Sequence, residues 1–380
     1  MYASAPVAGP PLQLQHSVKV SYDDGVYVLD GCLANNETMI AVSTSAQVIR
    51  CYDVRTTTHL FEMRDHTGPI RDMVVAPVAH PSLLFSVQED TGVAVSDLRI
   101  GKAVHFLNEM CSMGLDSYSL SVSEDGASLA LAAGKDIHFV DIRTWHSTRS
   151  ISELHTDDIT RVRYCGSDAI CTAGEDQMVN VLSTTEPDED EMMWNIINCE
   201  EVVTRMQYFS PDRIPLLATP EVAPRGVFAT VGSCENAWVI PVGEGEVARE
   251  KKLQRPNFET YQVEFAPWLG TLGQVTGLKD EDGNAGPLLI TDVVSGGVMG
   301  VMNGAHQEVV RIALSLPNGV LITGGEDGML AYWTQPQQQQ QQRTALDGGE
   351  DEMDNVSTTS SMKQRARISV PPSIKKGRPY

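Results

Sequence analysis

The segment LITGGEDGMLAYWT at residues 321–334 shows the pattern that decides the fold of this 380-residue chain. A hydroxyl residue, Thr323, is followed by an aspartate four positions later, and a strand is expected to end six positions after that. Two more segments have this spacing, LFSVQEDTGVAVSD at 84–97 and ICTAGEDQMVNVLS at 170–183. A histidine precedes the hydroxyl residue of each segment by 17 or 20 positions, so the pattern marks an internal repeat.

The four repeated positions hold a histidine, a hydroxyl residue, an aspartate and a strand-end residue. The copies are His306, Thr323, Asp327 and Trp333; His155, Thr172, Asp176 and Leu182; and His66, Ser86, Asp90 and Ser96. Short alternating apolar runs, such as IRDMVVAP and GVAVSDL, are separated by Gly, Asp and Ser turns. Strands of this length at this spacing predict an all-β sandwich, barrel or propeller.

These residues resemble the WD-repeat family, in which each unit of about 40–45 residues forms one four-stranded blade. The resemblance implies an all-β, seven-bladed WD-repeat β-propeller. It also implies that the copy ending at Trp333 forms the structural tetrad of that family, a buried series of hydrogen bonds. The other two copies lack the tryptophan. The expected blades cover about residues 24–65, 66–110, 111–154, 155–200, 201–257, 258–304 and 305–334.

The resemblance implies that the ring is closed by a strand from the other end of the chain. The last blade ends after three strands, and LQLQHSVKVSY at 12–22 is a spare strand. We expect residues 14–21 to pair with about 328–333, which removes an open sheet edge. Blade five carries an insertion near PDRIPLLATPEVAPRG, and the short sequence after the third strand of blade six leaves little room for a fourth.

The propeller is therefore expected to span residues 12–334, between two disordered segments. Residues 1–11 precede it, and residues 335–380 contain a glutamine run, the acidic patch DGGEDEMD and a basic end. Such compositions cannot bury enough apolar surface to fold. The clusters KQRAR and KKGRP in the tail fit either a nuclear address or an arm that folds back on the acidic body. We expect a protein of the cytoplasm, the nucleus or both.

The charge of the chain restricts its partners. The formal net charge is −22, and residues 1–342 carry −24 of charge because the tail is basic. Such a body repels nucleic acid and anionic membranes and attracts basic proteins, although solubility alone also explains an acidic surface. The sequence has no apolar run of about 18 residues that could span a membrane and no signal-peptide pattern.

No motif in the sequence predicts chemistry. The phosphate-binding GxxxxGK[ST], the zinc-binding HExxH and the nucleophile GxSxG patterns do not occur. The seven cysteines are scattered without a CxxC pair, and the acidic run 188–191 has no partner set with ligand spacing. The His–Asp pairs recur three times, whereas an active site is needed once. We expect no enzyme, no cofactor, no metal and no small-molecule substrate.

The turns of the repeats suggest a binding surface for a protein partner. The residue before each tetrad aspartate is a glutamate, and further acids follow the blade-opening histidines on the same face. The expected acidic rim consists of Glu89, Asp157, Asp158, Glu175, Glu235, Glu308 and Glu326. It would bind a basic protein segment. The simpler alternative is that acidic residues suit tight turns.

An alternative function rests on a second pattern, in which three successive blades end their third strand in Asp-x-Arg. The residues are Asp53 and Arg55, Asp97 and Arg99, and Asp141 and Arg143. They resemble the WDxR box of substrate receptors that dock on cullin-RING ubiquitin ligase adaptors, but they lack the tryptophan. An arginine that braces the turn to the fourth strand is the structural alternative.

Overall fold

The structure, a computed structural model, describes most of the propeller region. The described residues are 9–23, 25–76, 78–88, 92–107, 117–188, 191–219, 222–243, 249–253, 260–279 and 285–336. They belong to one unit within Met1–Pro336. The predictions of disorder for 1–8 and 337–380 lie outside the described residues. No helix in the described ranges is long and apolar enough to cross a bilayer.

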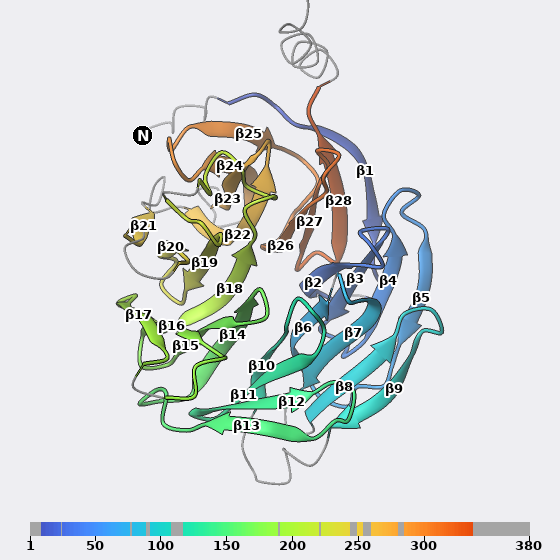
Figure 1. Cartoon of the computed structure of the whole chain (residues 1–380). Coiled ribbons are helices and arrows are strands. Elements are labelled where there is room, and N and C mark those ends of the chain that lie inside the picture. The colour runs from blue at the N-terminus through green and yellow to red at the C-terminus, as the bar shows by residue number, and fades with distance from the viewer. Residues whose placement is uncertain are drawn as a thin grey trace, which may run out of the picture. The chain divides into compact units, whose positions relative to one another are not determined.

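The described strands form seven four-stranded antiparallel sheets arranged as the blades of a ring, as predicted (Figure 1). Blade one contains β2 (Val28–Ala34), β3 (Met39–Thr44), β4 (Ile49–Asp53) and β5 (His59–Met63). Blade two contains β6 (Ile70–Ala76), β7 (His80–Gln88), β8 (Gly92–Asp97) and β9 (Lys102–Leu107). Blade three contains β10 (Ser117–Val122), β11 (Ser128–Ala133), β12 (Asp136–Asp141) and β13 (Ser147–Ile151).

The remaining blades follow the same order. Blade four contains β14 (Ile159–Cys165), β15 (Ala169–Gly174), β16 (Met178–Ser183) and β17 (Met193–Asn198). Blade five contains β18 (Val203–Phe209), β19 (Val227–Gly232), β20 (Ala237–Pro241) and β21 (Lys251–Leu253). Blade six contains β22 (Thr260–Trp268), β23 (Thr271–Lys279), β24 (Ala285–Asp292) and β25 (Val298–Met302). Blade seven contains β26 (Val310–Ser315), β27 (Leu321–Gly325), β28 (Met329–Thr334) and, from the start of the chain, β1 (Gln13–Lys19).

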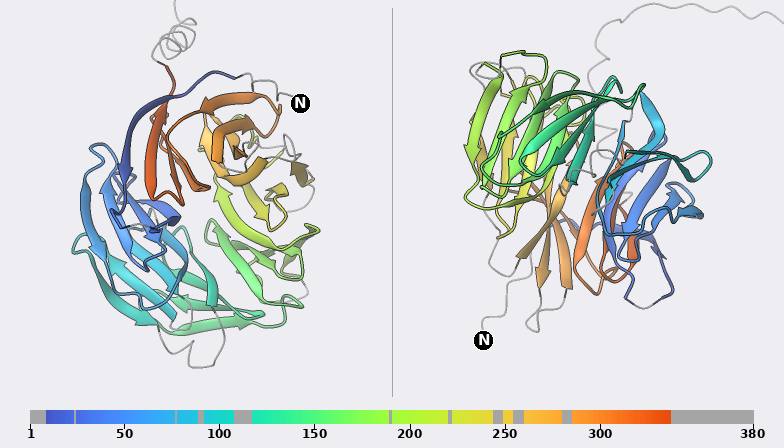
Figure 2. Two further views of the ribbon diagram at one scale, coloured as in Figure 1. Left: turned by 180° about the vertical axis from the view of Figure 1, so that it is seen from behind. Right: turned by 90° about the horizontal axis from the view of Figure 1, so that it is seen from below.

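The N-terminal strand closes the ring as predicted. β1 runs antiparallel to β28, with Gln13 opposite Thr334 and Lys19 opposite Met329. The views from both sides show β1 lying along β28 (Figures 1 and 2). Just before β1, the amide of Leu12 donates to the carbonyl oxygen of Val301 in β25 at 2.8 Å. The same N-terminal segment therefore ties blade six to blade seven.

The prediction that blade six has little room for a fourth strand was wrong. β25 follows β24 after a tight turn, in which the Ser295 hydroxyl donates to Asp292 at 2.7 Å and the Gly296 amide donates to the Asp292 carbonyl oxygen at 2.8 Å. Gly296 has a φ of +71°, a conformation that glycine adopts without strain. The turn is so short that the five residues of β25 fit before the next histidine.

The buried apolar residues form seven clusters, each between two neighbouring blades. One cluster joins blades seven and one through Ile40, Ile312 and Tyr332, and another joins blades four and five through Val181 and Phe228. Second strands such as β15 are buried along their whole length because a blade packs on each face. Outer strands such as β9 alternate between exposed and partly buried residues.

The antiparallel order of the blades defines two faces. The connections from the second to the third strand, and from each blade to the next, lie on one face, which we call the top. The other connections lie on the bottom. The first strands of consecutive blades contact one another around the ring, and β2 contacts β26 as well as β6. These inner strands surround a central cavity of about 930 Å³.

Candidate functional site

Blade seven holds an unbroken series of side-chain hydrogen bonds. His306 lies before β26, and its Nδ1 contacts the two carboxylate oxygens of Asp327 at 3.2 and 3.1 Å. The Nε2 atom lies 2.8 Å from Thr323 Oγ1, which also accepts a hydrogen bond from Trp333 Nε1 at 2.9 Å. The protonated Nδ1 can then donate to the carboxylate while the Thr323 hydroxyl donates to Nε2. The four residues of the predicted tetrad form one connected network.

The Asp327 carboxylate also braces the top turn around it. Its oxygens accept hydrogen bonds from the amides of Gln307 and Met329, both at 3.0 Å. Burial by itself raises the pKa of Asp327, but these bonds and the one from His306 outweigh it and lower the pKa overall. Asp327 therefore stays ionised, and its carboxylate binds the histidine and two amides of the turn, which is a structural role.

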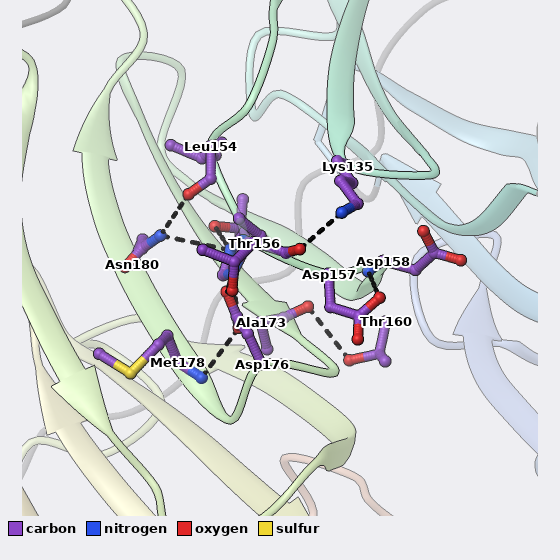
Figure 3. A network of polar contacts seen from close by, with 12 residues as sticks. Lys135, Leu154, Thr156, Asp157, Asp158, Thr160, Ala173, Asp176, Met178 and Asn180 are labelled. Atoms are coloured by element: carbon purple, nitrogen blue, oxygen red, sulfur yellow. Dashed lines mark hydrogen bonds and ion pairs between the residues drawn. The ribbon is translucent and has the colours of Figure 1, made fainter.

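Blade four repeats this arrangement without the tryptophan (Figure 3). His155 Nε2 lies 2.9 Å from Thr172 Oγ1, and Nδ1 lies 3.0 Å from an oxygen of Asp176. The strand-end residue Leu182 is buried and apolar. Asn180, two positions earlier on the strand, donates its side-chain amide to the Leu154 carbonyl oxygen at 3.2 Å, and the same nitrogen lies 3.3 Å from His155 Nε2.

Blade two keeps the histidine and the hydroxyl residue but adds a different acceptor. His66 Nε2 lies 3.1 Å from Ser86 Oγ, and Nδ1 lies 2.9 Å from the side-chain oxygen of Gln88. The predicted third member, Asp90, lies outside the described residues. Gln88 was not singled out from the sequence, because it stands two positions before the repeated aspartate.

The sequence alignment of blade five was wrong by two residues. In blades four, five and seven, one amide of the top turn donates to the carbonyl oxygen of the residue just before the first strand. The donors are Glu175, Ser233 and Glu326, each at 2.8 Å. The position of Glu175 is therefore occupied by Ser233 in blade five, and not by Glu235.

Glu235 instead takes the left-handed position of that turn, with a φ of 70° against 68° for Gln177 in blade four. Its carboxylate accepts a hydrogen bond from the amide of Gln262 in blade six. The turn itself is held by Glu201, whose buried carboxylate accepts from the amides of Cys234 and Asn236 at 2.6 and 2.8 Å. In blade five, Glu201 performs the role that the aspartate of the turn has in the other blades, so the turn lacks the aspartate on which the sequence alignment relied.

The acidic rim is most open on blade four. Asp157 and Glu175 are exposed, and Asp158 is partly exposed. The Glu175 amide donates to the Asp158 carbonyl oxygen, so the acids belong to adjoining turns. None of the three forms an ion pair with a described residue. The neighbouring Lys135 donates to the carbonyl oxygen of Thr156 at 2.6 Å, as Figure 3 shows.

The rim of blade seven differs because one of its acids is paired. Arg311, the second residue of β26, binds the Glu326 carboxylate, with Nε at 2.7 Å. Glu308 is exposed, and a hollow of about 310 Å³ between Glu308, Glu326 and Tyr27 lies at this side of the rim. Glu89, the predicted rim residue of blade two, lies outside the described residues.

Comparisons with known proteins agree with this architecture. No family model matches the sequence. The chain is similar to the WD repeat-containing protein 89 homolog of Dictyostelium discoideum, with 24% identity over 196 residues. That stretch covers 51% of this chain and 52% of the relative, so the chain spans about half the length of the curated relative that it matches. From the sequence we also expect a resemblance to WD repeat-containing protein 89 in the segments LHTDDITRVRY (154–164), ITGGEDGMLAYW (322–333) and RARISVPPSIKKGRPY (365–380).

The chain is a seven-bladed β-propeller, and the histidine networks and this similarity support a WD-repeat propeller. WD-repeat propellers are generally non-enzymatic, and their fold suggests a scaffold for protein interactions. In such a propeller the top, the bottom and the central cavity each offer a surface.

The Asp-x-Arg aspartates lie on the bottom of the propeller, where they cap turns. Asp53 accepts hydrogen bonds from the Thr56 amide and hydroxyl, and Asp141 does the same with Thr144, at 2.7 and 2.9 Å in both turns. Asp292, the corresponding aspartate of blade six, caps the same kind of turn, although no arginine stands two positions after it. The aspartates therefore have a structural task that is independent of any arginine.

The arginines of these boxes do not share one environment. Arg99 is exposed and binds the Asp97 carboxylate, with Nη2 at 2.6 Å. Arg55 and Arg143 are exposed and make no ion pair with a described residue. Docking on a ligase adaptor through these boxes stays a prediction.

A ring of charged side chains in the central cavity escaped the sequence analysis. Every inner strand has a bulge near its start, and the residues that follow the seven bulges are Asp30, Asp72, Ser119, Arg161, Arg205, Glu264 and Ile312. All but Ser119 and Ile312 line the cavity. The signal that could have found them is a comparison of residues near the start of each first strand, at the third position in six blades and at the fifth in blade six.

Three arginines of the cavity bind carboxylates on other blades: Arg213 pairs with Glu37, and the other two are Arg163 and Arg205. Arg163 binds Asp72 through two hydrogen bonds, at 2.7 and 2.8 Å, and also donates to Ser119 at 3.0 Å. Burial raises the pKa of Asp72, but the charge and hydrogen bonds of Arg163 outweigh it and lower the pKa. The Arg163–Asp72 pair connects blades four and two across the ring.

The second pair has a carboxyl group with the opposite pKa shift. Arg205 Nη1 lies 3.7 Å from Glu264, which also accepts hydrogen bonds from Gln207 at 2.6 Å and the Ala313 amide at 3.0 Å. Burial raises the pKa of Glu264 to about 7 despite these partners. Glu264 therefore titrates near neutral pH inside the cavity.

Proposed function

We propose that this WD-repeat propeller is a non-enzymatic scaffold that binds a basic segment of a protein partner on its top rim. The observation that carries the proposal is the group of exposed acids on blade four, Asp157, Asp158 and Glu175, which lack ion pairs with described residues. The body behind them is strongly acidic, with a formal charge of −24 over residues 1–342. Complementary charge mainly speeds association and makes it depend on salt.

The structure narrows the acidic rim that the sequence predicted. Glu235 is bonded to the neighbouring blade and Glu326 is bound by Arg311, so these two acids have less charge to offer a partner. Blade four keeps Thr160 at the position of Arg311, and Glu175 stays open for that reason. The proposed contact is therefore centred on blade four, with Glu308 as a second acidic point across the rim.

The test compares two triple variants of equal charge. The top variant is Asp157→Asn, Asp158→Asn and Glu175→Gln. The control is Glu124→Gln, Asp212→Asn and Glu250→Gln, which are exposed acids of the bottom connections. Each changes the formal net charge from −22 to −19, so long-range attraction falls equally in both.

Association of a lysine- and arginine-rich peptide is measured from low to physiological salt. We expect the top variant to lose more than tenfold in association rate and much of its salt dependence, and the control to stay within about twofold of the wild type. Proteins captured from native extract should be lost in the top variant alone. Equal rates and salt slopes in the two variants would contradict the proposal.

Two single changes sharpen the test. Arg311→Thr frees Glu326, so blade seven acquires the rim of blade four, and we expect faster association of the peptide. Thr160→Arg places a guanidinium beside Glu175, and we expect slower association. Opposite or absent effects of both changes would place the binding surface elsewhere.

A further inference from the structure

Three of the arginines that line the central cavity lie on neighbouring inner strands, and one of them, Arg161, forms no ion pair with a described residue. Arg161 and Arg163 come from β14 and Arg205 comes from the neighbouring β18, and all three line the cavity. Side chains two positions apart on a strand lie on the same face, so Arg161 and Arg163 emerge together. Three guanidinium groups therefore gather on the side of blades four and five.

Arg163 and Arg205 hold carboxylates, but Arg161 does not. Its guanidinium donates to the Thr160 carbonyl oxygen at 2.8 Å and forms no ion pair with a described residue. The acid that attracts it most is Asp72, whose two oxygens are already bonded to Arg163, and Asp30 of the same cavity attracts it less. Burial, and repulsion by the other two arginines, lower the pKa of Arg161, although an arginine stays charged at any physiological pH.

A brace across the ring does not need this third arginine. The pair of Arg163 with Asp72 already connects blades four and two, and the pair of Arg205 with Glu264 connects the neighbouring blades five and six. Arg161 is half-buried, and a charge that is partly withdrawn from water without a partner is costly, with like charges nearby adding to the cost. An anion with several oxygens would relieve both effects at once, because each guanidinium presents several N–H donors in a fixed plane.

We propose that the central cavity binds a small phosphate-bearing anion, with Arg161 as its main ligand and Arg205 as the second. The guanidinium plane matches the oxygens of a phosphate group in a bidentate fashion. The cavity of about 930 Å³ suits a small molecule, and its arginines lie within the ring of inner strands. The proposed ligands are arginines and not the rim acids, so the proposal does not depend on the function proposed above, although Glu175 of the rim also lines this cavity.

The test uses inorganic phosphate as the probe with the full chain. The melting temperature and the calorimetric heat of binding are measured against potassium chloride at matched ionic strength. Arg161→Gln is compared with Arg99→Gln, which removes an exposed arginine of the bottom face. Both variants have a formal net charge of −23 in place of −22, so general screening affects them equally.

We expect a saturable rise in melting temperature with phosphate for the wild type and Arg99→Gln, and at least a tenfold loss of affinity for Arg161→Gln. In potassium chloride, Arg161→Gln should melt at or above the wild-type temperature, because it lacks an unpaired charge. Arg161→Lys keeps the charge without the planar fork and should bind with intermediate affinity. Glycerol phosphate is tested beside inorganic phosphate. Tighter binding of glycerol phosphate would identify the ligand as a phosphate ester. Binding of inorganic phosphate that is at least as tight would identify it as free phosphate.

Two results would overturn the proposal. A wild type without a saturable phosphate response, together with an Arg161→Gln variant of lower melting temperature, would make Arg161 a structural brace. An unchanged phosphate response in Arg161→Gln would place any anion site outside the cavity.

Discussion

Blades four and seven share a scaffold but present different surfaces. In both, a histidine links a threonine hydroxyl to an aspartate with nearly equal distances. At the second residue of the first strand, blade four has Thr160 and blade seven has Arg311. Glu175 consequently makes no ion pair with a described residue, whereas Glu326 does. The repeat fixes where the backbone lies, and a single residue on the inner strand decides the charge of the rim.

The two blades also differ in how the chain supplies them. Blade four is continuous from β14 to β17, but blade seven borrows β1 from the start of the chain. Its inner amide at Ala313 is held by the Glu264 carboxyl, whereas the equivalent Val162 amide is held by the Ser119 hydroxyl at 3.1 Å. Blade seven therefore depends on the N-terminal strand and has an inner amide held by a titratable group, whereas all four strands of blade four are consecutive and its equivalent amide is held by a hydroxyl group.

The largest effect should come from removing residues 1–19. Blade seven then loses its outer strand and blade six loses the contact with Leu12, which leaves open sheet edges. We expect insoluble or molten protein, detected by loss of the near-ultraviolet dichroism and of a cooperative melt. His16→Ala, which keeps the strand, should fold normally. A soluble truncated protein with the wild-type melting curve would show that the ring closes without β1.

Next in size are Asp327→Ala and Asp176→Ala, which break the same network in the two blades. Each leaves a histidine and two backbone amides without an acceptor, at about 1–3 kcal/mol for each buried group. Asp327→Ala should lower the free energy of unfolding more, because β28, which receives β1, starts two residues later.

Urea unfolding measures both changes. Asp157→Asn on the same face is the control, and it should change the free energy of unfolding by less than about 0.5 kcal/mol. A loss of partner binding by Asp327→Ala at full stability would contradict the structural role assigned to this aspartate.

The stability of the protein should depend on pH through Glu264, which holds an amide of blade seven and has no counterpart at the equivalent amide of blade four. The pKa of Glu264 is raised to about 7, so folding favours its protonated form, and this stability is lost as pH rises through 7. Glu264→Gln removes the ionisation. From pH 5 to pH 8 the variant should therefore gain on the wild type by up to about 3 kcal/mol in the free energy of unfolding. A constant difference across this range would mean that Glu264 titrates normally.

The smallest expected effect concerns the residue that blade four lacks. Trp333→Phe keeps an aromatic ring but removes the 2.9 Å bond to Thr323, and should cost about 1 kcal/mol of unfolding free energy. Tyr332→Phe on the same strand is the matched control, because the Tyr332 hydroxyl is buried without a hydrogen-bond partner. If the two variants are equally stable, the tryptophan bond contributes nothing, and the leucine of blade four is an equivalent solution.

The fold could be predicted from the sequence because its main signals are local. The spacing of histidine, hydroxyl residue and aspartate recurs within single blades, and an unfinished last blade together with a spare first strand predicts the closure. The fourth strand of blade six was missed because a tight turn around Asp292 saves chain length that sequence spacing does not reveal.

The site was harder to predict because its residues meet only when the ring closes. Arg163 and Asp72 are 91 positions apart, and no repeated spacing connects them. Glu235 was misplaced because Glu201 holds the turn of blade five in place of the usual aspartate. Pairing across blades, as between Arg311 and Glu326, also decides which predicted acids remain open, and no pattern of residue types shows it.

The closing strand has a consequence for the time course of synthesis. Gln15 bonds to Thr334, 319 positions further along the chain. At about 5–20 residues per second, β1 waits roughly 15–60 s for β28 to be synthesised. β1 is exposed along most of its length even in the finished ring, and its sequence, QLQHSVK, is largely polar. Such a strand tolerates contact with water during the wait. The apolar inner strands are more prone to aggregate, but they pair with neighbouring strands soon after they are synthesised.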